Sequence, residues 1–139
     1  MLEKKLKIAL KEFKRNNFSK AEKLYAECLS IDPNLPEVHN LLGNIKLNSG
    51  NIITSINYFK KAIELNPNFS GAFCNLGLAY KKLKNNELAL ENYYKAINLN
   101  PKNFKALFNL ATYFKEKNDI ENAEKFYLKT IDVMPNLLE

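Results

Sequence analysis

Apolar stripes of helical spacing alternate along the chain with short polar breaks. Between residues 70 and 83 apolar or small residues follow the spacing i, i+3, i+4, i+7 and i+10: Phe73, Leu76, Gly77, Tyr80 and Leu83. This spacing places the side chains on one face of an α-helix. After a polar break at residues 84–86, a second stripe contains Leu88, Ala89, Tyr93, Ala96 and Ile97. The pattern predicts two consecutive helices, which form a hairpin.

The same hairpin recurs at a fixed period of 34 residues. Each copy ends near a proline: Pro33, Pro67, Pro101 and Pro135. Eight residues before each proline stands an aromatic residue, and twelve before it a small one: Tyr25, Phe59, Tyr93, Tyr127, and Ala21, Ser55, Ala89, Ala123. The breaks read RNN, SGN, KNN and KND, and Asn and Gly tolerate the left-handed conformation that ends a helix. Eight helices are therefore predicted, over residues 3–15, 19–31, 36–49, 52–65, 70–83, 86–99, 104–117 and 120–133.

Small residues at repeated positions predict close packing within each hairpin. Two antiparallel helices joined by a tight turn pack at about 8–10 Å. Gly43, Gly77 and Ala89 leave room for this approach, and the aromatic residues of the repeat fill the adjacent space. One hairpin cannot bury its apolar face alone. We therefore expect the hairpins to stack into a single domain over residues 1–139.

These residues resemble the tetratricopeptide repeat, a helix–turn–helix unit of 34 residues. The third repeat carries the family pattern at Leu76, Gly77, Tyr80, Ala89, Tyr93, Ala96 and Pro101. In the other repeats Glu12, Lys46 and Phe114 replace the first tyrosine. The resemblance implies an all-α, right-handed α-solenoid of four repeats, at about residues 2–35, 36–69, 70–103 and 104–137. It also implies a non-catalytic scaffold that binds a peptide or partner segment in a concave groove.

Composition narrows the environment and the partners that we expect. A chain of 139 residues with 46% hydrophobic and 26% charged residues is typical of a globular domain. No apolar run reaches the roughly 18 residues that span a bilayer, and lysines interrupt the N-terminal apolar segment, so a cytoplasmic location is expected. The net charge of +6 comes from lysines mixed with acids and a single arginine, which disfavours nucleic acid as a partner.

No constellation of residues predicts catalysis, a metal site or a cofactor. Cys28 and Cys74 follow no metal-binding or redox spacing, and we interpret both as reduced thiols. The only histidine, His39, occupies a packing position of the repeat. A nucleophile pair of Cys74 and His39 would lack a plausible third member. We therefore expect the chain not to be an enzyme.

Asparagines on the first helix of each repeat form one candidate site. In the family this helix lines the groove, and its groove positions hold Asn40, Asn44, Asn75 and Asn109. An asparagine amide both donates and accepts hydrogen bonds, so such a ladder can hold the backbone of an extended peptide regardless of its sequence. Asparagine is also common throughout this chain. The ladder therefore has a compositional explanation beside the functional one.

A partial carboxylate clamp overlaps this ladder. Co-chaperones of the family bind an acidic chaperone tail through Lys, Asn, Asn, Lys and Arg from three successive repeats. The matching positions hold Asn40, Asn44, Asn75, Lys105 and Asn109. Two of the three cations are thus replaced by asparagine, which argues against tight tail binding because charge-assisted hydrogen bonds are roughly twice as strong as neutral ones. Lys81, Lys82 and Lys115 still favour an acidic or C-terminal peptide.

The C-terminal end of the repeats predicts a third possibility. Arrays of this family usually close with an additional solvating helix, and the sequence after Pro135 does not contain one. We therefore expect partial exposure of apolar side chains in the last repeat: Phe126, Ile131, Val133, Leu137 and Leu138. Exposed apolar surface is typical of interaction sites. Two interpretations stay open: the chain is a fragment of a longer array, or it covers this end by self-association, which is an alternative function.

Overall fold

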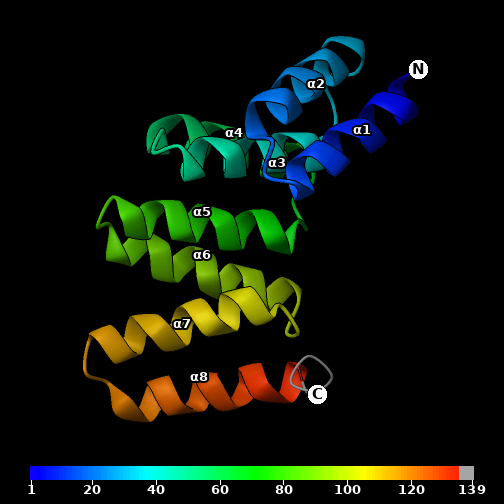
Figure 1. Cartoon of the computed structure of the whole chain (residues 1–139). Coiled ribbons are helices and arrows are strands. Elements are labelled where there is room, and N and C mark those ends of the chain that lie inside the picture. The colour runs from blue at the N-terminus through cyan, green and yellow to red at the C-terminus, as the bar shows by residue number, and fades with distance from the viewer. Residues whose placement is uncertain (135–139) are drawn as a thin grey trace. The chain divides into compact units, whose positions relative to one another are not determined.

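The computed structural model describes residues 1–134, which form helices joined by short turns (Figure 1). The helices of this part are α1 (Leu2–Lys14), α2 (Phe18–Ile31), α3 (Pro36–Asn48), α4 (Ile52–Leu65), α5 (Ser70–Lys82), α6 (Asn86–Leu99), α7 (Phe104–Glu116) and α8 (Ile120–Val133). No strand occurs among these residues, and none of the helices is long and apolar enough to cross a membrane. The predicted all-α fold is confirmed, and every helix end lies within one residue of its prediction.

The helices group into two compact units of two hairpins each. Unit 1 spans Met1–Pro67 and contains α1 to α4, whereas unit 2 spans Asn68–Glu139 and contains α5 to α8. Within each unit, the second helix of the first hairpin packs against the first helix of the next hairpin. Each unit therefore has an apolar core of its own. The single domain over residues 1–139 stays a prediction, and Pro135, Leu137 and Leu138 lie outside the described residues.

Every hairpin turns through one residue in the left-handed conformation. The four residues recur at the repeat period: Asn16 (φ 64°), Gly50 (φ 86°), Lys84 (φ 62°) and Asn118 (φ 61°). The next residue in the chain donates its backbone N–H to a carbonyl five residues earlier, as Asn17 does to Glu12 at 2.9 Å. This bond satisfies one of the last carbonyls of the first helix. The third turn differs from the others because a lysine occupies the position that favours glycine or asparagine.

Within a hairpin, an aromatic ring of the second helix lies against a small residue of the first. A methyl group placed on Gly77 of α5 would lie 2.7 Å from two ring carbons of Tyr93 on α6. A methyl group placed on Gly43 of α3 would likewise clash with the ring of Phe59 on α4. The rings of Tyr93 and Phe59 are completely buried. The predicted use of small residues for close helix approach is therefore confirmed.

One predicted exposure in the last repeat is wrong. Phe126 is only 3% exposed, because its side chain lies among helices of unit 2 rather than at the end of the repeat. Its ring stacks on Phe114 with centroids 5.7 Å apart, and Tyr94 of α6 meets it edge-on at 6.2 Å. Ile131 is 51% exposed, as expected, and Val133 is partly buried.

The first test concerns the contact between Gly77 and Tyr93. Alanine is favoured over glycine in a helix by about 1 kcal/mol, but overpacking a filled core costs about 1–3 kcal/mol. The new methyl would meet the Tyr93 ring at 2.7 Å and the Ala89 carbonyl oxygen at 3.1 Å. We expect Gly77→Ala to lower the free energy of unfolding by about 1 kcal/mol, measured by urea denaturation.

Gly71→Ala is the matched control in the same helix. A methyl group there would meet only the Phe69 ring, at an ordinary 3.5 Å. Its higher helix propensity should raise the stability by up to about 1 kcal/mol. Equal effects of the two substitutions would contradict the packing argument.

The second test concerns the left-handed residue of the third turn. A non-glycine side chain in this conformation costs of order 1 kcal/mol. Lys84 has φ 62°, so we expect Lys84→Gly to raise the free energy of unfolding by about 1 kcal/mol. Lys82→Gly, at the last residue of α5, should instead lower it by up to about 1 kcal/mol. Both values come from the same urea titration, and a loss of stability in Lys84→Gly would refute the assignment of strain.

Candidate peptide-binding face

In unit 2 the first helices of the two hairpins, α5 and α7, contact each other and carry six of the eight predicted binding residues. On each helix these residues recur at helical spacing and so share one side. The predicted residues are Asn75, Lys81 and Lys82 on α5 and Lys105, Asn109 and Lys115 on α7, and by their spacing Cys74, Phe108 and Glu116 share the same sides of these helices. We call this set the α5–α7 face.

A chain of hydrogen bonds aligns the starts of α5 and α7. Asn103, the N-cap of α7, accepts the backbone N–H of Ala106 at 3.1 Å and donates its side-chain amide to Ser70 Oγ at 2.8 Å. Ser70 Oγ in turn donates to the carbonyl of Ala96 at 2.7 Å. N-capping by asparagine contributes about 1 kcal/mol to helix stability. The same residue therefore starts α7 and attaches it to the start of α5.

Two side-chain contacts connect α5 and α7 across the face itself. The Asn109 amide nitrogen lies 3.6 Å from Cys74 Sγ and donates to it. Lys81 Nζ lies 3.3 Å from a Glu116 carboxylate oxygen. No hydrogen bond within residues 1–134 uses the Asn109 amide oxygen, so this oxygen can accept an N–H from a bound chain.

Three of the four lysines of the face remain available to an acidic partner. Lys82, Lys105 and Lys115 are exposed, and no ion pair in the described part of the chain includes them. Lys81 is paired with Glu116, but an ion pair of this exposure stabilises by only about 0–1 kcal/mol. A ligand carboxylate could therefore displace Glu116 at little cost.

The buried thiol of Cys74 is unsuited to nucleophilic chemistry. Burial raises the pKa of Cys74 to about 11, and the smaller lowering effects of the Asn109 hydrogen bond and the Lys105 charge do not offset it. The thiol is therefore neutral at physiological pH. His39, on α3 of unit 1, is buried and donates Nε2–H to the Pro33 carbonyl at 3.0 Å. These environments give no support to a catalytic Cys74–His39 pair. No group of three or more potential metal ligands occurs among the described residues.

The predicted site residues divide between the two units. Asn75, Asn109, Lys105, Lys81, Lys82 and Lys115 belong to the α5–α7 face, whereas Asn40 and Asn44 lie one turn apart on α3 of unit 1. Asn40 and Asn75 each take part in an interaction within the chain. A ladder or clamp that combines α3 with α5 and α7 therefore stays a prediction.

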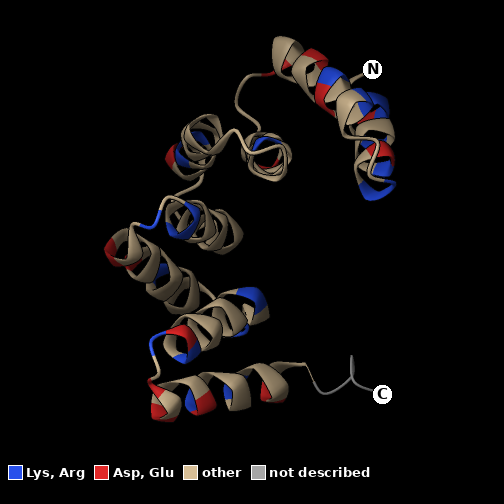
Figure 2. Ribbon diagram, turned by 60° about the vertical axis from the view of Figure 1, so that its left-hand side comes forward, with Lys and Arg blue, Asp and Glu red and all other residues tan. Residues whose placement is uncertain are grey.

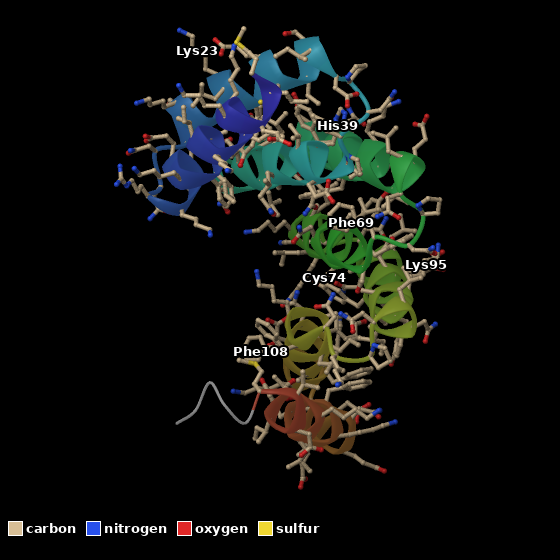
Figure 3. The ribbon with its side chains drawn as sticks, turned by 90° about the vertical axis from the view of Figure 1, so that its right-hand side faces the viewer. Lys23, His39, Phe69, Cys74, Lys95 and Phe108 are labelled. Carbon is tan, nitrogen blue, oxygen red and sulfur yellow. The ribbon has the colours of Figure 1, made fainter. Side chains whose placement is uncertain are left out.

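Three residues of the face, Cys74, Phe108 and Glu116, were not predicted as binding residues. Phe108 is 51% exposed, and Tyr127 meets its ring edge-on at 5.9 Å. Figure 3 shows Phe108 on the opposite side of unit 2 from Lys95 of α6. An aromatic residue at a groove position of the repeat was a signal for it. The signal for Glu116 was weaker. That signal is Lys81, which carries the opposite charge and stands 35 residues earlier.

Comparisons with known proteins identify the family of these repeats. Two models of the tetratricopeptide repeat match residues 71–103 and 92–125, and a TPR repeat model matches residues 43–84. The chain belongs to the tetratricopeptide repeat family. This membership supports a role as a protein–protein interaction scaffold, since arrays of this kind typically bind proteins without catalysis.

Solved structures of tetratricopeptide proteins share the fold at low sequence identity. A crystal structure of MamA is 21% identical, with a TM-score of 0.81 over 99% of this chain and 80% of that chain. TTC0263, a thermophilic TPR protein of Thermus thermophilus, is 16% identical, with a TM-score of 0.87 over 97% of this chain and 75% of that chain. MamA from residue 41 to its end, from Desulfovibrio magneticus RS-1, is 19% identical, with a TM-score of 0.80 over 98% and 77%.

The environment of Cys74 predicts slow alkylation. A pKa of about 11 for this thiol reduces its thiolate fraction at pH 8 roughly 100-fold relative to an ordinary cysteine. We expect iodoacetamide to label Cys74 in the folded chain at least about 100-fold more slowly than in the urea-unfolded chain. Mass spectrometry of tryptic peptides distinguishes Cys74 from Cys28. Equal labelling rates in the two states would contradict the burial of the thiol.

Proposed function

We propose that this tetratricopeptide protein is a non-catalytic scaffold that binds an extended, acidic peptide segment of a partner on the α5–α7 face. The observation that carries the proposal is a set of three neighbouring side chains on α7, each of which offers a different kind of contact. Lys105 offers an unpaired charge, Phe108 offers an exposed ring, and Asn109 offers a free amide oxygen on a side chain held by Cys74. A peptide can use all three at once.

The positions of these residues on α7 support a peptide of a particular chemistry. Lys105 and Asn109 lie four residues apart on α7, which is about 6 Å along the helix axis. The Asn109 oxygen accepts a backbone N–H, which needs no particular side chain. Lys105 then pairs with a carboxylate close to that backbone group, and Phe108 packs against an apolar side chain. The favoured ligand therefore has an apolar residue next to an aspartate or glutamate.

Asn75 extends the same surface by one repeat. It stands on α5 at the position that Asn109 occupies on α7. Because Asn75 already takes part in an interaction within the chain, a bound peptide has to exchange with that interaction. The energetic contribution of Asn75 should therefore be smaller than that of Asn109.

An acidic chaperone tail is a second candidate ligand. Asn44, Asn75 and Lys105 match the carboxylate clamp of family co-chaperones. Asn40 and Asn109 stand where the clamp has cations, and the Asn109 amide donates to Cys74. The missing charges make this ligand bind more weakly than in a complete clamp.

Self-association is a third candidate, and exposed apolar residues of α8 favour it. Ile120, Leu128 and Ile131 are 64%, 54% and 51% exposed. Light scattering over a range of concentrations tests this candidate directly. A constant monomer mass would exclude it.

Peptide titration tests the proposal on the full chain. The probe is a fluorescein-labelled ten-residue peptide rich in Asp and Glu with one central Phe, followed by fluorescence anisotropy. Loss of a charge-assisted hydrogen bond and of an amide contact costs about 1.5–3 kcal/mol together. We expect the double variant Lys105→Gln/Asn109→Ala to bind at least about tenfold more weakly, and binding to weaken as salt is added.

The control variant Lys102→Gln/Asn98→Ala makes the same chemical changes at exposed positions of unit 2 outside the face. Its affinity should equal that of the unaltered chain. Equal loss in the two double variants would refute binding at the α5–α7 face. A probe ending in Glu-Glu-Val-Asp, tested with a free and an amidated C-terminus, separates the chaperone-tail candidate, which requires the free carboxylate.

A further inference from the structure

A cavity in unit 1 is lined by residues of α3 and α4, none of which was predicted to bind a ligand in the groove. Its volume is about 260 Å³. Four of its lining residues recur at helical spacing on α4 and the fifth comes from α3: Thr54, Asn57, Tyr58, Lys61 and His39. The rings of His39 and Tyr58 lie beside each other, with centroids 6.2 Å apart. We call this site the His39 cavity.

The His39 cavity lies where the first repeat makes a direct contact between its two helices. The positions of His39 and Lys61 hold Lys5 and Glu27 in the first repeat, and these two residues form an ion pair at 3.2 Å. In the second repeat the imidazole bonds to a backbone carbonyl, and Lys61 pairs with Glu64 of its own helix at 3.3 Å. Both side chains therefore line the cavity instead of pairing with each other.

The small size of the histidine ring accounts for the space. The tetratricopeptide pattern has a tryptophan three residues before its Leu-Gly pair, and His39 holds this position before Leu42 and Gly43. An imidazole is much smaller than an indole, so it fills only part of the space that the pattern provides. A cavity that a larger side chain would fill can bind an aromatic molecule from outside.

His39 also provides a buried hydrogen-bond acceptor. The side chain is 9% exposed (Figure 3), and its Nε2–H donates to the Pro33 carbonyl at 3.0 Å. In a neutral imidazole with this tautomer, Nδ1 carries a lone pair and can only accept a hydrogen bond. Nδ1 is covered from solvent and has no hydrogen-bond partner within the described residues. Because an unpaired buried polar atom costs free energy, a ligand that donates to Nδ1 recovers this cost.

The charges around the cavity favour a neutral donor. The charged residues of α4, which Figure 2 colours blue and red, are Lys60, Lys61 and Glu64, and of these only Lys61 lines the cavity. An ammonium donor would be repelled by Lys61, and a carboxylate has no proton to donate. A neutral aromatic ring meets neither obstacle. Its face can also contact the Lys61 ammonium group, as the Phe73 ring contacts that of Lys95 at 5.8 Å in the third repeat.

We infer that the His39 cavity binds an aromatic ring that carries an N–H donor, of which indole is the simplest example. The N–H donates to His39 Nδ1, the ring packs against Tyr58, and the ring face meets the Lys61 ammonium group. Tyr58 is only half-buried, so its side chain can turn aside and give the donor access to Nδ1. The cavity belongs to unit 1 and is independent of the function proposed for the α5–α7 face.

A pair of probes tests for the donor on the full chain. The probes are fluoroindole and its N-methyl derivative, which has the same ring without the N–H, and fluorine NMR follows their titration. We expect the methylated probe to bind about fivefold to tenfold more weakly. The chain has one histidine, so its ring signals belong to His39, and its Nδ1 signal should shift with fluoroindole. Equal affinities of the two probes would overturn the inference.

His39→Phe separates the hydrogen bond from the bulk of the added methyl group. This variant keeps a ring at the position and removes the acceptor, and the third repeat has phenylalanine in the same place, at Phe73. The preference for fluoroindole over its methylated form should disappear in the variant. A preference of unchanged size would mean that Nδ1 takes no part, and the inference would fail.

Two further variants test the place of binding. His39→Trp fills the cavity from within, so we expect it to abolish binding of both probes while circular dichroism shows an unchanged helix content. Tyr58→Leu removes the aromatic wall and should weaken binding about threefold or more. Its control is Tyr94→Leu, a change of a tyrosine of α6 that is 38% exposed, and this control should not alter the affinity. Unchanged binding in His39→Trp, or equal losses in the two tyrosine variants, would contradict the assignment.

A third probe, N-acetyl-fluorotryptophan amide, distinguishes the sources of such a ring. Tighter binding of this amide than of fluoroindole supports the inference with a tryptophan side chain of a partner protein as the ligand. Tighter binding of fluoroindole supports it with a small heterocyclic molecule. If no probe binds up to its solubility limit, the inference is refuted. It is also refuted if binding is lost in Lys105→Gln/Asn109→Ala and retained in His39→Trp, because the probes then occupy the α5–α7 face.

Discussion

The rest of this structure depends on a close contact between paired helices. An aromatic ring of one helix packs directly against a glycine of the other. Tyr93 and Phe59 occupy the space that a methyl group on Gly77 or Gly43 would need. The hydroxyl of Tyr93 has no hydrogen-bond partner among the described residues, and burial raises its pKa. Phe59 fills the equivalent position without a hydroxyl. The requirement is therefore for a flat ring of the right size, and the polar group of the tyrosine is tolerated rather than used.

In unit 2, α6 packs against α7, and the first helices of the two hairpins, α5 and α7, also contact each other. In unit 2 the hydrogen bonds from Asn103 to Ser70 and from Ser70 to Ala96 then align α5 with α7. The exposed lysines of the α5–α7 face, Lys82, Lys105 and Lys115, form no ion pair among the described residues, and the stability of the unit comes from the core on the other side of the helices.

One pair of positions shows how the repeat tolerates different chemistry at the same place. In the first repeat it holds Lys5 and Glu27, which form an ion pair at 3.2 Å. In the third repeat it holds Phe73 and Lys95, whose ammonium group lies 5.8 Å from the ring centroid. The exchange of an ion pair for a cation–π contact explains why the first repeat fits the family pattern with a lysine at a position that is bulky elsewhere.

The eight helices of the described residues, their turns and the closely packed small residues followed from the sequence alone, because helical periodicity, left-handed turns and hairpin packing depend on residues that are near one another or recur at one period. The sequence also predicted part of the candidate binding site, since each groove position is defined by its place in the repeat. Tertiary structure alone decided how these residues are used: that Asn109 donates to Cys74, that Lys81 pairs with Glu116, and that Phe126 is buried. These outcomes depend on distances between side chains about one repeat apart or on different helices, which a local pattern does not specify.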